Sequence, residues 1–457
     1  MPETFVNIVQ KKLRNKYFRR RLVVYIILVI ILLVIIVNGI KGIIASKKYD
    51  EQWKYEQLLF GELQERNAKI TKFYTYGTSF GIEGTLDQVD QANFENVKVV
   101  LVDNELDEEE IPIEGTVENN VLSFRSAQIN NTVLLDNMIA GRTYYLKLRL
   151  KTNNSVEPKY YMFENASKYP DIEYYTVTRN GKNNKIDISF EKCNTVDGKT
   201  YSCLYFKVQE AKLPDNVYDV VIDAGHGGKD DGYTAAGYTE ADVCLEISDL
   251  IKQHLEKAGF KVAMTRDENN TDTFTKTNMY DDNGRISIAC RSNAKYMLSI
   301  HITQGNSRMR GCEVYAPGRC NLNFARLLAN KMVEGTNIDF SNDNDNQVFD
   351  GVYVNNYTPH LIQVAAESAE NSGYEPYDIT EDTPYIYSIR EVGGIATGAY
   401  MDGRNTAYGK NKFYNSNKGI ESYQINLGYI DKDLYNILNG KEDFAYAITD
   451  AFEEAFK

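Results

Sequence analysis

The chain lacks an excess of basic charge, has almost no tryptophan and contains few histidines. Its 457 residues include 64 acidic and 51 basic side chains, which gives a formal net charge of −13. General nucleic-acid binders need a basic surface, so this charge balance excludes that class and predicts no nucleic-acid partner. The chain has one Trp and four His. With 43% hydrophobic and 25% charged residues, its composition is that of a folded protein rather than a disordered one.

The six cysteines do not have the CxxC spacing of a zinc ribbon. Cys193 and Cys203 flank a glycine-containing turn and could form a disulfide across a hairpin. Cys244 and Cys290 fall on the apolar faces of predicted helices, where a free buried thiol is the commoner state. The cysteines therefore allow a hairpin disulfide but indicate no function.

A long apolar run lies near the N-terminus. Leu22–Val37 is uninterrupted, and apolar residues resume after Asn38 up to Ala45. About 20 apolar residues are enough for a helix to cross a bilayer. Seven basic residues against one acidic residue precede Leu22, and this bias keeps the N-terminus in the cytoplasm. We therefore predict a cytoplasmic tail over residues 1–21, a single transmembrane anchor over residues 22–45, and the remainder outside the cytoplasm at the cell membrane.

A cleaved signal peptide is the alternative interpretation of this run. The apolar core of a signal peptide holds roughly 7–15 residues and ends at a small-residue cleavage site. Ala45-Ser46 is the available site. The sixteen-residue length of Leu22–Val37 favours the uncleaved anchor.

The next segments differ in their periodicity. Residues 46–72 are charged and helix-favouring and predict a helical stalk. Residues 73–211 change to a period of two, most clearly in Tyr145–Lys151, where leucine alternates with basic residues. Turn signals at Asn180-Gly181 and Asp197-Gly198 separate such runs. We expect a β-sandwich-like region here, with a role in spacing or binding.

From residue 215 to residue 457 buried strands alternate with helical patterns. Val217–Asp223 and Tyr296–Ile302 are predicted strands, and Thr239–Ala258 between them has apolar residues at helical spacing. This alternation predicts an α/β domain whose mixed, largely parallel sheet is flanked by helices. The polar stretch Asn337–Tyr423 predicts long loops over one rim of the sheet, where substrate contacts tend to lie. A single final helix is expected from about Asp431.

Two of the four histidines come at the ends of predicted strands. His226 follows the first strand in a glycine-rich turn, and His301 ends the strand at Leu298–His301. Ligands of open α/β sheets bind beyond the carboxyl ends of the strands, and Glu240 at the start of a helix can point back to the same rim. Two imidazoles and one carboxylate with an open fourth position form a catalytic zinc set. Taken singly, a turn histidine or a glutamate at a helix start can instead be purely structural.

These residues lie within a set of five runs in the C-terminal part of the chain. The runs are VVIDAGHGGKDDG (Val220–Gly232), GYTEADVCLEIS (Gly237–Ser248), GFKVAMTRD (Gly259–Asp267), NGRISIACRSNAKYMLSIHI (Asn283–Ile302) and GCEVYAP (Gly311–Pro317). In this order they resemble the zinc-dependent N-acetylmuramoyl-L-alanine amidases with an α/β catalytic domain. The resemblance implies that His226, Glu240 and His301 bind Zn²⁺. It also implies that the substrate is peptidoglycan, cleaved at the amide between the lactyl group of muramic acid and the first L-alanine of the stem peptide.

One position departs from the family pattern. The family carries its catalytic Glu near the C-terminus in a run similar to V-E-L-G-F/Y, and the corresponding position in this chain is Asn426. A carboxylate there takes a proton from water and returns it to the leaving nitrogen, whereas Asn can only orient a water. Losing a general base typically costs about 10²–10⁴ in rate. Glu421, Glu367 and Glu391 are the candidates to replace it.

Three functions remain at this stage. A zinc amidase acting on peptidoglycan is favoured. A catalytically weak or inactive amidase-like protein that binds the cell wall is the alternative, because of Asn426. A zinc peptidase is disfavoured because the motifs are amidase-like throughout. The sequence makes no prediction about oligomeric state.

Overall fold

The computed structural model describes residues 16–61, 63–126, 135–168, 171–176, 183–267, 281–320, 322–373, 379–397 and 419–456. The predicted turn at Asn180-Gly181 lies outside these ranges. The chain divides into two compact units, Met1–Leu63 with Lys192–Tyr201, and Gln64–Glu191 with Ser202–Lys457.

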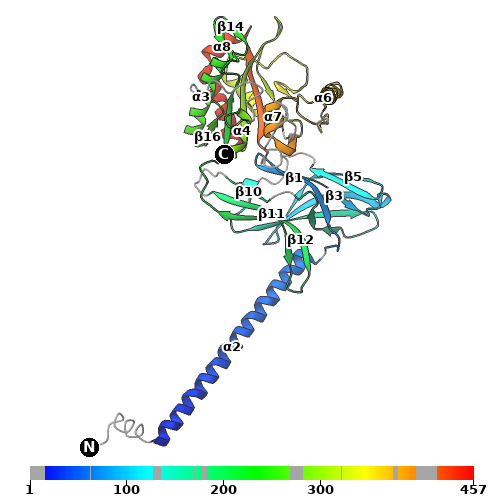
Figure 1. Cartoon of the computed structure of the whole chain (residues 1–457), viewed down its shortest axis with the longest axis vertical. Coiled ribbons are helices and arrows are strands. Elements are labelled where there is room, and N and C mark those ends of the chain that lie inside the picture. Colours follow the sequence, from blue (N-terminus) through cyan, green and yellow to red (C-terminus); the bar gives the residue numbers. More distant parts are fainter. Residues whose placement is uncertain are drawn as a thin grey trace, which may run out of the picture. The chain divides into compact units, whose positions relative to one another are not determined.

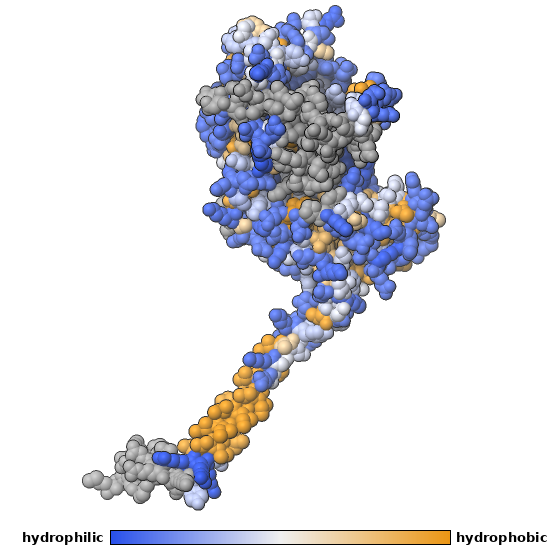
Figure 2. Space-filling model, viewed as in Figure 1, coloured by the Kyte–Doolittle hydropathy of each residue, from blue (hydrophilic) through white to orange (hydrophobic). Residues whose placement is uncertain are grey.

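The first unit contains one long helix, α2 (Lys16–Phe60), which is long and apolar enough to cross a membrane (Figure 1). Its large apolar side chains between Leu22 and Ile44 are exposed, and Figure 2 shows them as a continuous apolar band. At its C-terminal end Glu56 accepts a hydrogen bond from the amide of Val196 (2.7 Å). The helical part of the predicted stalk at 46–72 is therefore shorter than expected. The helix ends at Phe60, and residues Ala68–Tyr76 already form a strand.

The second unit begins with the predicted β-sandwich, in which two sheets enclose one apolar core. Leu146, Leu148 and Leu150 point into this core, while Arg149 on the other face pairs with Glu110. One sheet has the order β5-β6-β2-β1-β9, and the other has β10-β11-β12-β7-β3-β4 with β8 paired to β7. The strands are β1 (Ala68–Tyr76), β2 (Ser79–Asp87), β3 (Phe94–Asp103), β4 (Glu108–Ile111), β5 (Ile113–Glu118), β6 (Val121–Ser126), β7 (Thr143–Thr152), β8 (Lys159–Tyr161), β9 (Phe163–Asn165), β10 (Ile172–Tyr175), β11 (Asn184–Asn194) and β12 (Thr200–Glu210).

The cysteines follow the expected division. Cys193 and Cys203 are disulfide-bonded, so the hairpin disulfide that the sequence allows is formed. Cys244 and Cys290 are free thiols. Burial raises the pKa of the Cys244 thiol well above its ordinary value, so it packs as a neutral apolar group.

The α/β part contains a mixed, largely parallel sheet, as predicted. Its order is β16-β13-β17-β21-β18-β20-β19, and the four strands β16, β13, β17 and β21 run parallel. Strand β18 is antiparallel to β21. The strands are β13 (Val220–Ala224), β16 (Val262–Met264), β17 (Tyr296–Thr303), β18 (Glu313–Tyr315), β19 (Gln347–Phe349), β20 (Val352–Tyr353) and β21 (Glu421–Tyr429), and a separate pair is formed by β14 (Thr234–Ala235) and β15 (Tyr238–Thr239).

Helices cover both faces of this sheet (Figure 1). Helices α3 (Glu240–Lys257), α5 (Asn323–Gly335) and α9 (Lys441–Phe456) pack on the face that carries Leu298, Ile300 and Ile302. Helices α4 (Arg285–Arg291) and α7 (Tyr387–Val392) pack on the other face, against residues such as Val221 and Met297. Because side chains alternate along β17, Ser299 and His301 point to this second face, beyond the residues that α4 and α7 cover.

Two expectations for this part need correction. The stretch Asn337–Tyr423 is not only loop, since it contains β19, β20, α6 (Pro359–Asn371), α7 and a 3₁₀ turn at Gly394–Thr397. Thr358 caps α6 and Pro359 occupies its first turn, which are ordinary helix-start signals within a polar stretch. The final helix is two helices, α8 (Leu434–Asn439) and α9, because α8 ends at Gly440.

Candidate metal centre

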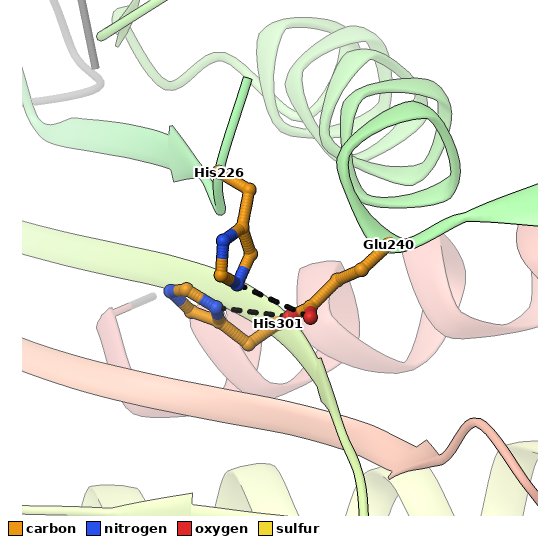
Figure 3. A group of neighbouring side chains, drawn as sticks. All are labelled: His226, Glu240 and His301. Atoms are coloured by element: carbon orange, nitrogen blue, oxygen red, sulfur yellow. Dashed lines mark hydrogen bonds and ion pairs between the residues drawn. The ribbon is translucent and has the colours of Figure 1, made fainter. Parts of the chain in front are cut away.

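The side chains of His226, Glu240 and His301 converge near the carboxyl ends of β13 and β17 (Figure 3). One donor atom from each lies within 4.8 Å of the other two. Nε2 of His226 is 3.1 Å from Oε2 of Glu240, and Nδ1 of His301 is 3.1 Å from Oε1 of the same carboxylate. The two imidazole rings are nearly perpendicular, with centroids 5.2 Å apart. One carboxylate is thus shared between two imidazoles.

His226 is presented by a constrained turn. Its φ of 56° is in the left-handed region, which costs a non-glycine residue about 1–2 kcal/mol. Two buried arginines stabilise this turn. Arg285 donates to the carbonyl of His226 (3.2 Å), and Arg266 donates to the carbonyls of Ala224 (3.0 Å) and Gly225 (2.8 Å). Strained backbone held by such contacts is typical of functional sites.

Glu240 occupies the first turn of α3, and its side chain is 1% exposed. Thr239 caps the helix by accepting from the amide of Asp242 (3.1 Å), which fixes where α3 begins. The Glu240 carboxylate also accepts from the amides of Ile302 (3.0 Å) and Tyr233 (3.2 Å). Burial raises the pKa of Glu240, but His226 and His301 outweigh this effect and lower the pKa to about 2. Glu240 is therefore an anion at any physiological pH.

Each histidine also has a partner behind it. The second ring nitrogen of His226, Nδ1, lies 2.9 Å from the carboxylate of Asp230. Burial lowers the pKa of His226, but the Glu240 and Asp230 carboxylates together raise it above its ordinary value. Such outer partners fix ring orientation in metal sites.

His301 is connected to a buried polar network beneath the sheet rim. Its Nε2 lies 3.2 Å from the hydroxyl of Ser299, which donates to Asp223 (2.6 Å). Asp223 is fully buried and also accepts from Thr265 (2.6 Å) and Arg285 (3.2 Å). Burial raises the pKa of Asp223, but Arg285 and the two hydroxyl donors lower it below its usual value. The Asp223–Arg285 pair therefore contacts the His226 turn directly and His301 through Ser299.

Two glycines leave the room that this group occupies. A Cβ on Gly225 would lie 2.6 Å from the ring of His301. A Cβ on Gly232 would lie 2.7 Å from Oε2 of Glu240 and 2.8 Å from the ring of His226. Any larger residue at either position would displace the group.

The donor set suits a divalent transition metal. Two imidazole nitrogens and one carboxylate oxygen are common zinc ligands, and the glycines keep backbone close without filling the space between them. These residues could hold a metal ion with no change in the fold.

Asn426 lies next to this group on β21. It pairs in register with His301 on β17, and its side chain is 5% exposed. On its other side it pairs with Glu313 on β18, whose carboxylate accepts from Nδ2 of Asn426 (2.7 Å). The sheet therefore brings Asn426 beside the candidate metal ligands, but it adds a buried carboxylate that the sequence reasoning did not single out.

Glu421 lies at the opposite end of β21. It pairs with Tyr296 at the start of β17 and accepts from the hydroxyl of Tyr423. It precedes Asn426 by five positions along the strand, a distance of about 16 Å. The catalytic role expected for Glu421 does not fit this position. The alternatives fit no better, because Glu367 is exposed on α6 and Glu391 is buried on α7 against Arg390.

Four supporting residues were not recognised in the sequence: Asp223, Asp230, Ser299 and Glu313. Three of them share one signal, a polar side chain within a buried strand. Asp223 is the next-to-last residue of β13, Ser299 precedes His301 by two residues on the same face of β17, and Glu313 begins β18. Asp230 lies in the turn after His226 and does not have this signal. A polar residue within a buried strand needs a partner, but the sequence does not say which one.

Comparison with known proteins gives matches in the α/β part. Residues 220–369 match the family described as N-acetylmuramoyl-L-alanine amidase. A germination-specific N-acetylmuramoyl-L-alanine amidase of Bacillus subtilis is 31% identical over 90 residues, which are 18% of this chain and 38% of that protein. The uncharacterized protein YqiI of the same organism is 30% identical over 96 residues, which are 21% of this chain and 43% of that protein. The chain thus spans about two fifths of the length of these curated relatives.

Solved structures match over a longer stretch. The amidase AmiC2 of Nostoc punctiforme is 21% identical, with a TM-score of 0.33, and the match covers 53% of this chain and 98% of that one. The catalytic domain of CwlV, an amidase of Paenibacillus polymyxa, is 19% identical, with a TM-score of 0.32, and the match covers 52% and 98%. The family match, which ends before β21, covers both β13 and β17 and all three converging side chains. Residues 220–369, which include all three converging side chains, are thus similar to the N-acetylmuramoyl-L-alanine amidase family.

Proposed function

We propose that the chain is a membrane-anchored, zinc-dependent hydrolase that cleaves the amide between N-acetylmuramic acid and the L-alanine of the peptidoglycan stem peptide. The observation that carries this proposal is the convergence of His226, Glu240 and His301 within one amidase-family domain. The alanine amide is the bond named in the family description.

His226, Glu240 and His301 would hold the zinc ion. Zinc in such a site lowers the pKa of a bound water to roughly 7 and polarises a carbonyl. Asp230 and Ser299 would keep the two imidazoles in their ligating orientation. Asp230 contacts Nδ1 of His226 and Ser299 contacts Nε2 of His301, and in each ring this is the nitrogen that does not face Glu240. The backbone amides of Ile302 and Tyr233 hold the Glu240 carboxylate, so little rearrangement is needed on binding.

Helix α2 would anchor the protein in the cell membrane. The apolar part of this helix, which begins at Leu22, is exposed along its length. Seven basic residues of the chain precede Leu22. With the basic tail in the cytoplasm, the amidase domain would act outside it, where peptidoglycan is found.

A catalytically weak or inactive protein that binds the cell wall is the second candidate. Asn426 favours it, because an amide cannot accept the proton that hydrolysis releases. This candidate keeps the same metal group but assigns it a binding role.

The test uses the full chain purified in detergent micelles. Its zinc content is measured, and it is incubated with purified peptidoglycan while newly freed L-alanine amino groups are quantified. Release that is lost in Glu240→Gln supports the amidase. Bound zinc without release supports the binding candidate, and a chain that takes up no zinc counts against both.

A further inference from the structure

Glu313 contacts Asn426, which occupies the position where the amidase family carries its catalytic Glu. Its Oε2 atom accepts from Nδ2 of Asn426 at 2.7 Å. Neighbouring strands lie about 4.8 Å apart, so Glu313 is one strand further from His301 than Asn426 is.

The three residues form one row across the sheet. His301 on β17 pairs with Asn426 on β21, and Asn426 pairs with Glu313 on β18. Paired residues on adjacent strands point to the same face. The side chain of Glu313 therefore shares the face of the candidate metal ligands, whereas its neighbour Val314 belongs to the apolar core on the other face.

The surroundings of Glu313 are unusual for a buried carboxylate. The residue is 1% exposed, and among the residues that the structure describes its partners are neutral donors: Asn426, the hydroxyl of Ser341 (2.9 Å) and the hydroxyl of Tyr429. Buried carboxylates usually pair with a cation, as Glu391 does with Arg390. A carboxylate kept in such a place without a cation is a candidate for a functional role.

The acceptor capacity of Glu313 is not fully used. Ser341 and Tyr429 both donate to Oε1, and Asn426 alone donates to Oε2. A carboxylate offers about four lone-pair positions, so one remains on Oε2, the oxygen nearer to Asn426. Asn426 must also turn Nδ2 toward the carboxylate, which leaves its Oδ1 to accept from other donors, such as Gln424 (3.3 Å).

We propose that Glu313 is the proton-accepting carboxylate of this site. It takes the role of the Glu that the family carries at the position of Asn426. This inference rests on the proposed amidase function and assigns its missing general base. Asn426 keeps the carboxylate aligned and orients the attacking water through Oδ1.

The reaction balances with this one carboxylate. An O–H bond of water breaks as its oxygen forms a bond to the amide carbon, and the proton goes to Oε2 of Glu313. The C–N bond then breaks, and the same proton passes to the leaving nitrogen of L-alanine. The products are a lactyl carboxylic acid and a free amine, and Glu313 returns to its anionic form.

The test compares three variants of the full chain with the unaltered chain. Glu313→Gln keeps the shape but removes the proton acceptor, and we expect turnover to fall by about 10²–10⁴. Its zinc content and its affinity for an uncleaved muramyl dipeptide should stay as in the unaltered chain, because Glu313 holds neither. The exchange Glu313→Gln/Asn426→Glu keeps one carboxylate and one amide in contact but swaps their places, and turnover should recover. If Glu313→Gln alone proves unstable, this exchange variant still gives the answer.

Glu421→Gln tests the other carboxylate on β21. Turnover lost in Glu421→Gln but retained in Glu313→Gln overturns the inference, as does unchanged turnover in Glu313→Gln when the unaltered chain is active. Loss of zinc in Glu313→Gln also overturns it, since the residue would then support the metal. Bound zinc without any release by the unaltered chain overturns the proposed function and this inference together, which separates the two failures.

Discussion

Asn426 on β21 lies directly beside His301 on the parallel strand β17, in register with it. The pairing connects the candidate metal ligands to Glu313 through one side chain. Several outcomes can be expected from the contacts around this row.

Removing a ligand should abolish zinc binding. Glu240→Gln retains the shape but not the charge that two imidazoles share. We expect the full-length Glu240→Gln variant to contain less than stoichiometric zinc, measured by atomic emission after dialysis. His360→Ala is the matched control, because His360 is exposed on α6. Stoichiometric zinc in Glu240→Gln would contradict the assignment of this residue.

The network behind His301 should tune metal affinity. Ser299→Ala removes the hydroxyl that joins His301 to Asp223. Outer partners of metal ligands typically contribute 10- to 100-fold in affinity, so a weakening of that order is expected in a competition titration with a chelator. Ser422→Ala removes another buried hydroxyl of the same sheet, one without a hydrogen-bond partner in the described part of the chain, and should not weaken binding. Equal affinities for the two variants would show that the network has no role.

Gly232 should be required for zinc binding because it leaves space for the Glu240 side chain, and not only because it adopts a left-handed backbone conformation. Gly232→Ala introduces both a left-handed alanine (φ +65°) and a Cβ 2.7 Å from Glu240. Gly237→Ala introduces a similar strain (φ +86°) with no atom within 4 Å. Both variants should lose about 1–2 kcal/mol in the free energy of unfolding, but only Gly232→Ala should lose zinc affinity. A similar loss of affinity in both would contradict this account.

Zinc affinity should fall as the pH is lowered. His226 must be neutral to ligate, and the Glu240 and Asp230 carboxylates raise the pKa of the metal-free imidazole above 6.5. Protons should therefore compete with zinc below this raised pKa. Glu240, whose pKa is about 2, should add nothing to the dependence above pH 4. Calorimetric titrations between pH 5 and pH 8 test this, and an affinity that does not change over that range would contradict it.

In the metal-free chain the same raised pKa has a consequence for stability. Protonated His226 stabilises the fold below its unfolded pKa near 6.5, and this contribution is lost as the pH rises through the folded pKa. The difference in unfolding free energy between the unaltered chain and His226→Gln should therefore shrink from pH 6 to pH 9. A difference that grows with pH would reverse the predicted sign.

The apolar helix should remain part of the mature protein. We expect the full chain to stay in the membrane fraction after a carbonate wash, with the residues after Lys47 open to external protease. N-terminal sequencing of the mature protein provides the control. A mature chain that begins at Ser46 would establish a cleaved signal peptide instead.

The sequence predicted the fold class and the convergence of His226, Glu240 and His301 because both follow from local patterns. His226 and His301 each come at the end of an apolar strand, and Glu240 begins a helix, so each could be placed at one rim without knowing the rest. The alternation of leucine in β7 likewise predicted the sandwich.

The row from His301 to Glu313 could not be predicted in the same way. It depends on which strands are neighbours, and β18 reaches β21 in the antiparallel direction over more than 100 residues of intervening chain. Glu313 lies in the run Gly311–Pro317, and nothing in that run indicates which strand it pairs with. Glu421 is only five positions from Asn426 in the sequence, but an extended strand places the two far apart. Contacts between distant strands are set by the assembled sheet, not by local periodicity.

The central claim is that His226, Glu240 and His301 share one zinc ion, and X-ray absorption at the zinc edge of the full chain tests it most directly. The account predicts light-atom ligands only, with two imidazole nitrogens at about 2.0–2.1 Å and carboxylate or water oxygens at about 2.0–2.2 Å. Sulfur ligands at about 2.3 Å, or a chain without zinc, would contradict it.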